Sequence, residues 1–178
     1  MEYTIREVRT EDLAGVTALE AECFPAAEAA EEASLGQRIA AFPGSFFVAE
    51  DEDGRIIGMI NGAVTDRRTI CDEMFEDAGM HREDGAYQSI FGLDVAPDWR
   101  RRGVAAALME RMIRGAKEAG RRGMILTCKD RLIPYYEKFG YRNLGVSASV
   151  HGGAVWYDMI LEFDRTEASG PAANTCWE

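Results

Sequence analysis

Several residue types are scarce in this 178-residue sequence, and their scarcity narrows what the protein can be. It has two histidines and four cysteines, and no two cysteines form a CxxC pair, so we expect neither a zinc site nor a disulfide scaffold. No run of about 18 apolar residues occurs, and the first residues lack the basic and apolar segments of a signal peptide. The sequence therefore predicts a cytoplasmic protein with no metal site and no membrane-spanning helix.

Basic residues are also in the minority. The 20 lysines and arginines are outnumbered by 31 aspartates and glutamates, which gives a net charge of −11 at pH 7. Solubility explains much of such a charge, but a surface of this sign also disfavours nucleic acid and anionic membranes and favours cationic partners. We expect no nucleic-acid partner and no membrane partner.

The length and the apolar fraction of 47% are sufficient for one globular domain with a sizeable core. We predict this domain over residues 1–164, followed by a polar C-terminal tail over residues 165–178. The spacing of apolar residues predicts strands near residues 3–8, 45–50, 55–65, 87–95, 124–128, 141–150 and 155–163. It predicts helices near residues 10–23, 35–42, 104–119 and 133–139. Residues 66–86 lack a clean periodicity and are expected to form a partly helical loop on the substrate side.

The strongest local signal is a strand that runs through a basic, glycine-containing loop into a helix. It covers residues 93–105, where three arginines at positions 100–102 precede Gly103. Backbone N–H groups at a helix N-terminus are unpaired, the helix dipole favours negative charge there, and small residues at Gly103 and Ala105 let a phosphate approach closely. The pattern indicates an anion-binding loop, with a solvated basic turn as the alternative. Trp99, beside the arginines, either stacks on a bound base or covers the start of the helix.

Two motifs, separated by a helix and a strand, carry a family resemblance. Residues 100–105 read Arg-Arg-Arg-Gly-Val-Ala and match the pyrophosphate loop Q/R-x-x-G-x-G/A. Residues 136–141 read Tyr-Glu-Lys-Phe-Gly-Tyr and are similar to the motif Y-x-x-x-G-F/Y, in which Tyr136 takes the place of a catalytic tyrosine. In this order and spacing the two motifs resemble the GNAT superfamily of acetyl-CoA-dependent N-acetyltransferases.

The resemblance implies a fold and a binding mode for the acyl donor. The fold is α/β (α+β), with a mixed, mostly antiparallel seven-stranded sheet that is flanked by helices and splayed between strands 4 and 5. Acetyl-CoA is expected in the splay, with its pantetheine arm beside the fourth strand and its pyrophosphate on residues 101–106. The implied cofactor-binding residues are Leu93, Asp94, Val95, Arg100, Arg101, Arg102, Gly103, Val104, Ala105 and Ala106.

The resemblance also implies direct attack of an amine on the thioester in a ternary complex. Tyr136 is implied as the general acid for the departing sulfur, since a phenol with a pKa of about 10 keeps its proton at neutral pH. The residues identify no secure general base, and Ser89, Gln88 and Asp66, acting through water, are the candidates. Cys128 is disfavoured as a nucleophile because no histidine lies near it in the sequence.

Within the superfamily, residues 127–141 are most similar to the arylalkylamine (serotonin-type) N-acetyltransferases. Two histidines that relay the amine proton in that branch fall here on Ser89 and Phe91, so the proton relay must differ. We predict acetyl transfer from acetyl-CoA to a cationic primary amine, either a small (aralkyl)amine or a polyamine. Acetylation of protein N-termini or lysines and a non-catalytic acyl-CoA-binding module are the alternatives, and a homodimer stays open.

Overall fold

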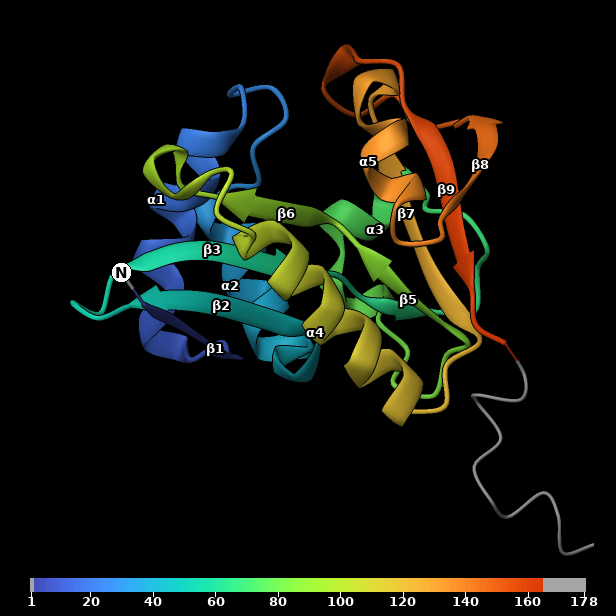
Figure 1. Ribbon diagram of the computed structural model, residues 1–178. Helices are drawn as coiled ribbons and strands as arrows, with labels where there is room; N and C mark the ends of the chain where they lie inside the picture. Colours follow the sequence, from blue (N-terminus) through green and yellow to red (C-terminus); the bar gives the residue numbers. More distant parts are fainter. Residues whose placement is uncertain (1, 165–178) are drawn as a thin grey trace, which may run out of the picture.

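The computed structural model describes residues 2–164, so the predicted tail over residues 165–178 lies outside the described residues (Figure 1). Its strands form a four-stranded sheet of order β1-β2-β3-β6 and a five-stranded sheet of order β4-β5-β7-β9-β8. The first sheet comprises β1 (Tyr3–Glu7), β2 (Phe46–Asp51), β3 (Ile56–Asn61) and β6 (Gly92–Val95). The second comprises β4 (Val64–Thr65), β5 (Tyr87–Ile90), β7 (Gly123–Cys128), β8 (Arg142–Val146) and β9 (Tyr157–Glu162).

The strand count differs from the expected seven because two expected strands are each broken in two. The expected strand over residues 55–65 becomes β3 and β4, and the one over residues 87–95 becomes β5 and β6. The break coincides with a close approach of the two segments, since a Cβ on Gly62 would lie 1.9 Å from the carbonyl oxygen of Ser89. Both segments change sheets there, and the two sheets share this junction.

Helices flank the sheets as expected. They are α1 (Leu13–Cys23), α2 (Glu32–Ala41), α3 (Asp72–Glu76), α4 (Val104–Glu118) and α5 (Ile133–Glu137). In Figure 1, α4 crosses the front of the sheets, and α1 and α2 cover the opposite face of the first sheet. The short α3 lies within the segment expected to be a partly helical loop. Among the described residues, no helix has the length and hydrophobicity needed to cross a membrane.

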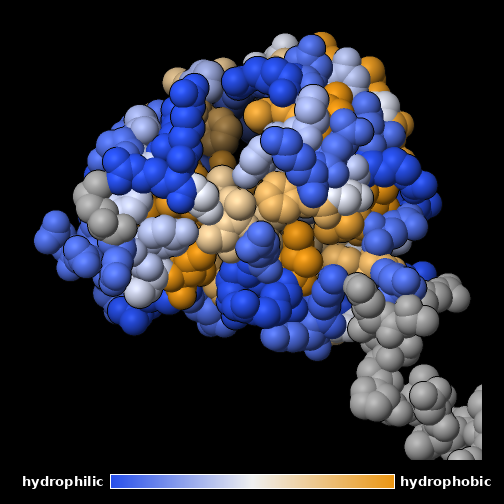
Figure 2. All heavy atoms as spheres, in the orientation of Figure 1, coloured by the Kyte–Doolittle hydropathy of each residue, from blue (hydrophilic) through white to orange (hydrophobic). Residues whose placement is uncertain are grey.

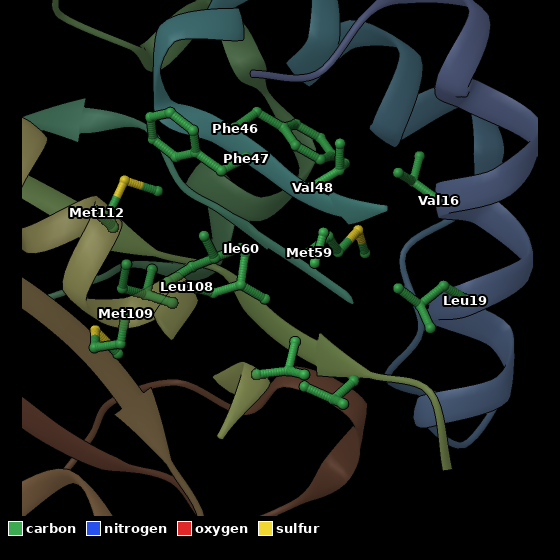
Figure 3. Packing of buried hydrophobic residues seen from close by; sticks show 14 of the residues in the cluster. Val16, Leu19, Phe46, Phe47, Val48, Met59, Ile60, Leu108, Met109 and Met112 are labelled. Atoms are coloured by element: carbon green, nitrogen blue, oxygen red, sulfur yellow. The ribbon is translucent and has the colours of Figure 1, made fainter. Parts of the chain in front are cut away.

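One buried cluster joins the first sheet to the helices on both of its faces (Figure 3). Val16 and Leu19 of α1 pack toward Met59, while Leu108 and Met112 of α4 pack on the other face. These helical residues recur at intervals of three or four, so each helix buries one stripe against the sheet. The packing fixes α4, and with it the basic loop that precedes the helix, to the strand β6.

The sheets separate between β6 and β7. The strands β5 and β7 are paired in parallel from Tyr87↔Gly123 to Ile90↔Leu126, whereas the other described strand pairs are antiparallel. Beyond Ile90 the chain leaves β7, and β6 pairs antiparallel with β3 while β7 continues beside β9. The expected splay between the fourth and fifth strands is therefore confirmed, with β5 and β6 together as the fourth strand (Figure 1).

Candidate active site in the splay

The splay contains a cavity of about 410 Å³. Its walls come from α1, α2 and the segment that links them, from α3, and from the two separating strands β6 and β7. The α5 residue Tyr136 and the β8–β9 loop, residues 147–156, complete the lining. Figure 2 shows the surface hollowed between the two halves of the molecule, with hydrophobic residues inside and hydrophilic residues around the opening.

The lining combines aromatic rings with carboxylates. The rings are those of Phe24, Phe75, Phe91 and Trp156, and the carboxylates are those of Glu20, Glu28, Glu31 and Glu76. Glu31 and Glu76 are exposed at the opening, whereas Glu20 is buried on the cavity floor. Exposed carboxylates at the mouth of an apolar cavity attract cations and repel anions.

The β8–β9 loop forms a roof over the cavity. His151 Nε2 lies 2.9 Å from the backbone oxygen of Glu28, and the His151 ring stacks on Phe75 with the ring centroids 4.9 Å apart. The backbone N–H of Val150 donates to Asp72 Oδ2 at 3.0 Å. These contacts tie the roof to α3 and to the α1–α2 segment, so the cavity has the dimensions of a small molecule rather than of an open groove.

Tyr136 enters the cavity from α5, which begins with Ile133 and Pro134 directly after a short 3-10 turn. It is 9% exposed and packs edge-on against Tyr135 and Tyr141. Burial, followed by the nearby Cys128, Tyr135 and Asp94, raises the pKa of Tyr136 above its ordinary value. The phenol therefore holds its proton at neutral pH and is available as a proton donor to a negative charge that forms in the cavity.

The basic loop has unpaired backbone donors. Gly103 caps α4 in the left-handed conformation with a φ of 81°, and Arg101 has a φ of 63°, which is uncommon for a residue with a side chain. Within the described chain, the N–H groups of residues 101–106 have no acceptor, and the first paired one is that of Ala107, which donates to Gly103 O at 3.0 Å. This arrangement can bind an anion through several amides at once.

The strand β6 supplies the other predicted binding residues. Leu93 lines the cavity, and β6 is an edge strand of the first sheet, so its second edge faces the splay. The Val95 carbonyl accepts from Arg100 Nε at 3.1 Å, which turns this arginine back toward the strand. The Asp94 side chain is 1% exposed and lies on the buried side of the strand. The second edge of β6 leaves its backbone available to pair with an extended ligand.

The structure places the candidate bases outside the cavity lining. The Ser89 hydroxyl donates to Ala63 O at 2.6 Å, and the Gln88 amide donates to Gly62 O at 2.7 Å, so both side chains are used within the fold. Asp66 accepts from the backbone N–H of Ala86 at 3.1 Å and lies in a separate surface depression. None of the three is positioned to contact a molecule in the splay.

Trp99 and Cys128, which the sequence analysis also considered, are both buried in the fold. Trp99 is 4% exposed and packs edge-on against Tyr3, so it covers the start of the helix. Burial raises the pKa of Cys128 to about 11, and this thiol therefore stays protonated at neutral pH. Among the described residues, no group of three or more potential ligands could hold a metal ion.

Sequence reasoning missed a buried charged cluster at the floor of the cavity. Arg38 of α2 is 5% exposed, and it donates to Asn61 Oδ1 and to the backbone oxygen of Phe75, each at 3.0 Å. Glu20 is also 5% exposed and lies near Asp94. The signal that could have revealed the cluster is Arg38 itself, because it shares the apolar stripe of its helix with Leu35, Ile39 and Phe42. A charge on a buried stripe requires buried partners.

Comparisons with known proteins agree with this geometry. A serotonin N-acetyltransferase from Mesocricetus auratus is 30% identical to this chain over 110 residues, which cover 61% of this chain and 51% of the relative. The chain therefore spans about half the length of the curated relatives it matches. The GNAT-like decarboxylase GphF, solved with isobutyryl-CoA, superimposes with a TM-score of 0.76 at 23% identity, covering 89% of this chain and 98% of that one. Naa20 from Chaetomium thermophilum, solved with a bisubstrate analogue, superimposes with a TM-score of 0.69 at 26% identity, and the match covers 91% of this chain and 87% of that one. A model of the Acetyltransferase (GNAT) family matches residues 13–141, and the chain belongs to this family.

Proposed function

We propose that this protein transfers an acetyl group from acetyl-CoA to a small cationic primary amine, by direct attack in a ternary complex. The observation that carries the proposal is the position of one cavity in the splay, with Tyr136 in its wall and carboxylates at its mouth. The anion-binding loop lies at the end of the strand that lines this cavity. Acetyl-CoA and the acceptor amine can therefore meet beside the phenol of Tyr136.

The residues present fit acetyl-CoA. The unpaired amides of residues 101–106 and the arginines of the loop would hold the pyrophosphate, and the free edge of β6 would pair with the pantetheine amides. Gly103 leaves space for this contact, because no described residue other than its chain neighbours lies within 4 Å of a Cβ built on it. Amides of β6 near Leu93 would polarise the thioester carbonyl.

The cavity favours a small amine with a positive charge. Glu31 and Glu76 attract a cation to the mouth, and the aromatic walls accommodate an apolar or aromatic body. The roof contacts of His151 restrict the length of the acceptor. The similarity to serotonin N-acetyltransferases supports an arylalkylamine, and a polyamine fits the same acidic mouth.

The chemistry requires the amine to lose a proton, attack the thioester carbon and expel the thiolate of coenzyme A. The C–N bond forms and the C–S bond breaks, and the thiolate takes the phenolic proton of Tyr136. The nitrogen that attacked still carries an extra proton and a positive charge, and the phenolate of Tyr136 takes this proton to leave the neutral amide. No acyl-enzyme is needed, in line with the protonated state of Cys128.

The substitution Tyr136→Phe tests the acid role. We expect kcat for coenzyme A release to fall about 10²- to 10⁴-fold with an unchanged Kd for acetyl-CoA, because only the proton donor is lost. Tyr135→Phe is the matched control, since Tyr135 is the preceding residue of the same helix and does not line the cavity. Equal rates for the two variants would remove Tyr136 from the mechanism.

Acetylation of a protein N-terminus is the second candidate, supported by the 26% identity to Naa20. The roof over the cavity weighs against it, because a peptide needs an open groove on both sides of its first residue. A panel that contains arylalkylamines, polyamines and short peptides separates the two candidates. Coenzyme A release with peptides alone would favour the second.

A further inference from the structure

The cavity floor holds two carboxyl groups without their usual partners. Glu20 Oε2 accepts from the backbone N–H of Ala30 at 2.8 Å, but Glu20 Oε1 is buried, and residues 2–164 supply no hydrogen-bond donor to it. Neither oxygen of Asp94 has a donor among the described residues, although the residue is only 1% exposed. Buried carboxylates of this kind are costly unless a proton or a ligand satisfies them.

The two carboxyl groups lie side by side on one face of β6. A Cβ built on Gly92 would lie 3.2 Å from Asp94 Oδ1 and 3.6 Å from Glu20 Oε1. Gly92 and Asp94 are two residues apart on the strand, so they share a face, and the absence of a side chain at Gly92 leaves room between them and the cavity. Both Glu20 and Gly92 line the cavity.

Among the described residues, Arg38 is the cation that acts on Asp94. Its hydrogen bonds go to Asn61 and to the Phe75 carbonyl, and its Nε has no acceptor in the part of the chain that the structure describes. Two ionised carboxylates at this depth would repel each other more than Arg38 can offset. Burial, and then the neighbouring Glu20, raise the pKa of Asp94 well above its ordinary value. Burial and the close approach of the two carboxyl groups therefore favour a proton on Asp94.

We propose that Glu20 is the catalytic base of the reaction and that Asp94 is a positioning residue that shares a proton with it. This inference rests on the proposed function. The ammonium group of the acceptor gives one proton to Glu20 Oε1, which converts a carboxylate to a carboxylic acid and the ammonium to a free amine. The amine then attacks the thioester, and Glu20 releases the proton to solvent after the product leaves. Charge and protons balance, because one proton is released for each acetyl group transferred.

Acid and base then lie on opposite sides of the splay. Tyr136 on α5 is close enough to Asp94 on β6 for the carboxylate to influence its pKa. The other groups that act on the pair are Cys23 of α1 and Arg38 of α2. A thioester between β6 and α5 would have the base on the side of the amine and the acid on the side of the sulfur. This arrangement replaces the histidines that are absent at Ser89 and Phe91.

The test is a series of acceptors of falling basicity with the wild type and Glu20→Gln. Glutamine keeps the acceptor oxygen for Ala30, so the variant preserves the local fold, and an unchanged Kd for acetyl-CoA checks this. With an alkylamine of pKa about 10 at neutral pH, we expect kcat/KM to fall about 10²- to 10⁴-fold. With an amine that is already neutral at the assay pH, the two proteins should differ far less. Glu22→Gln is the matched control, because Glu22 is exposed on the same helix.

The pH profile of Asp94→Asn tests the shared proton. Two interacting carboxyl groups titrate in two steps that belong to the pair. The wild-type profile of kcat/KM should therefore contain one more ionisation than the profile of the variant. A role limited to packing would change the rate but leave the number of ionisations unchanged.

Three outcomes separate the inference from the proposed function. An active wild type with a basicity-dependent defect in Glu20→Gln supports the inference. An active wild type with equal rates for Glu20→Gln and Glu22→Gln overturns the inference alone. A wild type that releases no coenzyme A with any amine overturns the proposed function and the base with it.

Discussion

The anion-binding loop gives a prediction whose two consequences can be separated. Replacing Gly103 by alanine puts a methyl group on a residue with a φ of 81°, and the new atom lies more than 4 Å from the other described residues, its chain neighbours aside. The cost to folding is therefore backbone strain alone, about 1 to 2 kcal/mol. For a chain of this length we expect Tm to fall by about 2–8 °C.

The cost to binding is additional. The methyl group occupies open space at the unpaired amides, where the pyrophosphate is proposed to bind. Loss of one hydrogen bond to a charged group is worth about 1.5–3 kcal/mol, so the Kd for acetyl-CoA should rise about 10- to 150-fold. Calorimetric titration with acetyl-CoA, together with thermal unfolding of the free protein, measures both effects.

The matched control is at the other end of the same helix. Gly120 has a φ of 75°, and an added Cβ there likewise meets no other residue of the described chain within 4 Å, its chain neighbours aside. Gly120→Ala should lower Tm by a similar amount and leave the Kd for acetyl-CoA unchanged. If the two variants bind acetyl-CoA equally well, the pyrophosphate does not contact the α4 N-terminus and the reasoning is refuted.

Three more predictions follow from the buried groups. Because the pKa of Asp94 is raised in the folded state, its contribution to stability is complete below pH about 4 and is lost as pH rises toward the folded-state pKa. In that window the free energy of unfolding of Asp94→Asn should rise relative to the wild type by up to about 1.4 kcal/mol per pH unit. Urea unfolding of both proteins at acidic and neutral pH measures this, and a pH-independent difference would be inconsistent with a shared proton. Because the pKa of Cys128 is about 11, mass spectrometry after incubation with acetyl-CoA alone should find no acetyl group on this residue, and a stoichiometric thioester there would favour an acyl-enzyme. Arg38→Met should destabilise the protein by about 3–5 kcal/mol in urea unfolding, since it leaves Glu20 and Asp94 without their cation, and a loss below about 1 kcal/mol would contradict the buried cluster.

Local signals in the sequence were sufficient to predict the basic loop and the helix α4. The arginines, Gly103 and the apolar stripe that includes Val104 and Leu108 lie within a few residues of one another, and each reports on its own backbone conformation. The motif at Tyr136 likewise lies within one helix and the turn after it. Such features could be read from the sequence because they depend little on distant parts of the chain.

The broken strands and the carboxyl pair depend on distant contacts. Near Phe91 the chain stops pairing with β7 and begins to pair with β3. This change coincides with the close approach of Gly62 to Ser89, which lies 27 positions later in the sequence. Glu20 and Asp94 come from a helix and a strand that meet only after the first sheet has packed on α1. Periodicity along the sequence carries no information on which buried carboxyl group will lie beside another.

The central claim is the transfer of an acetyl group to a small amine. Its most direct test is to incubate the wild-type protein with acetyl-CoA and a panel of arylalkylamines, polyamines and peptides, and to measure coenzyme A and the N-acetylated product together. The account predicts equal amounts of both with at least one small cationic amine and little release with peptides. Tight binding of acetyl-CoA without acetylation of any acceptor would contradict the account and identify the protein as an acyl-CoA-binding module.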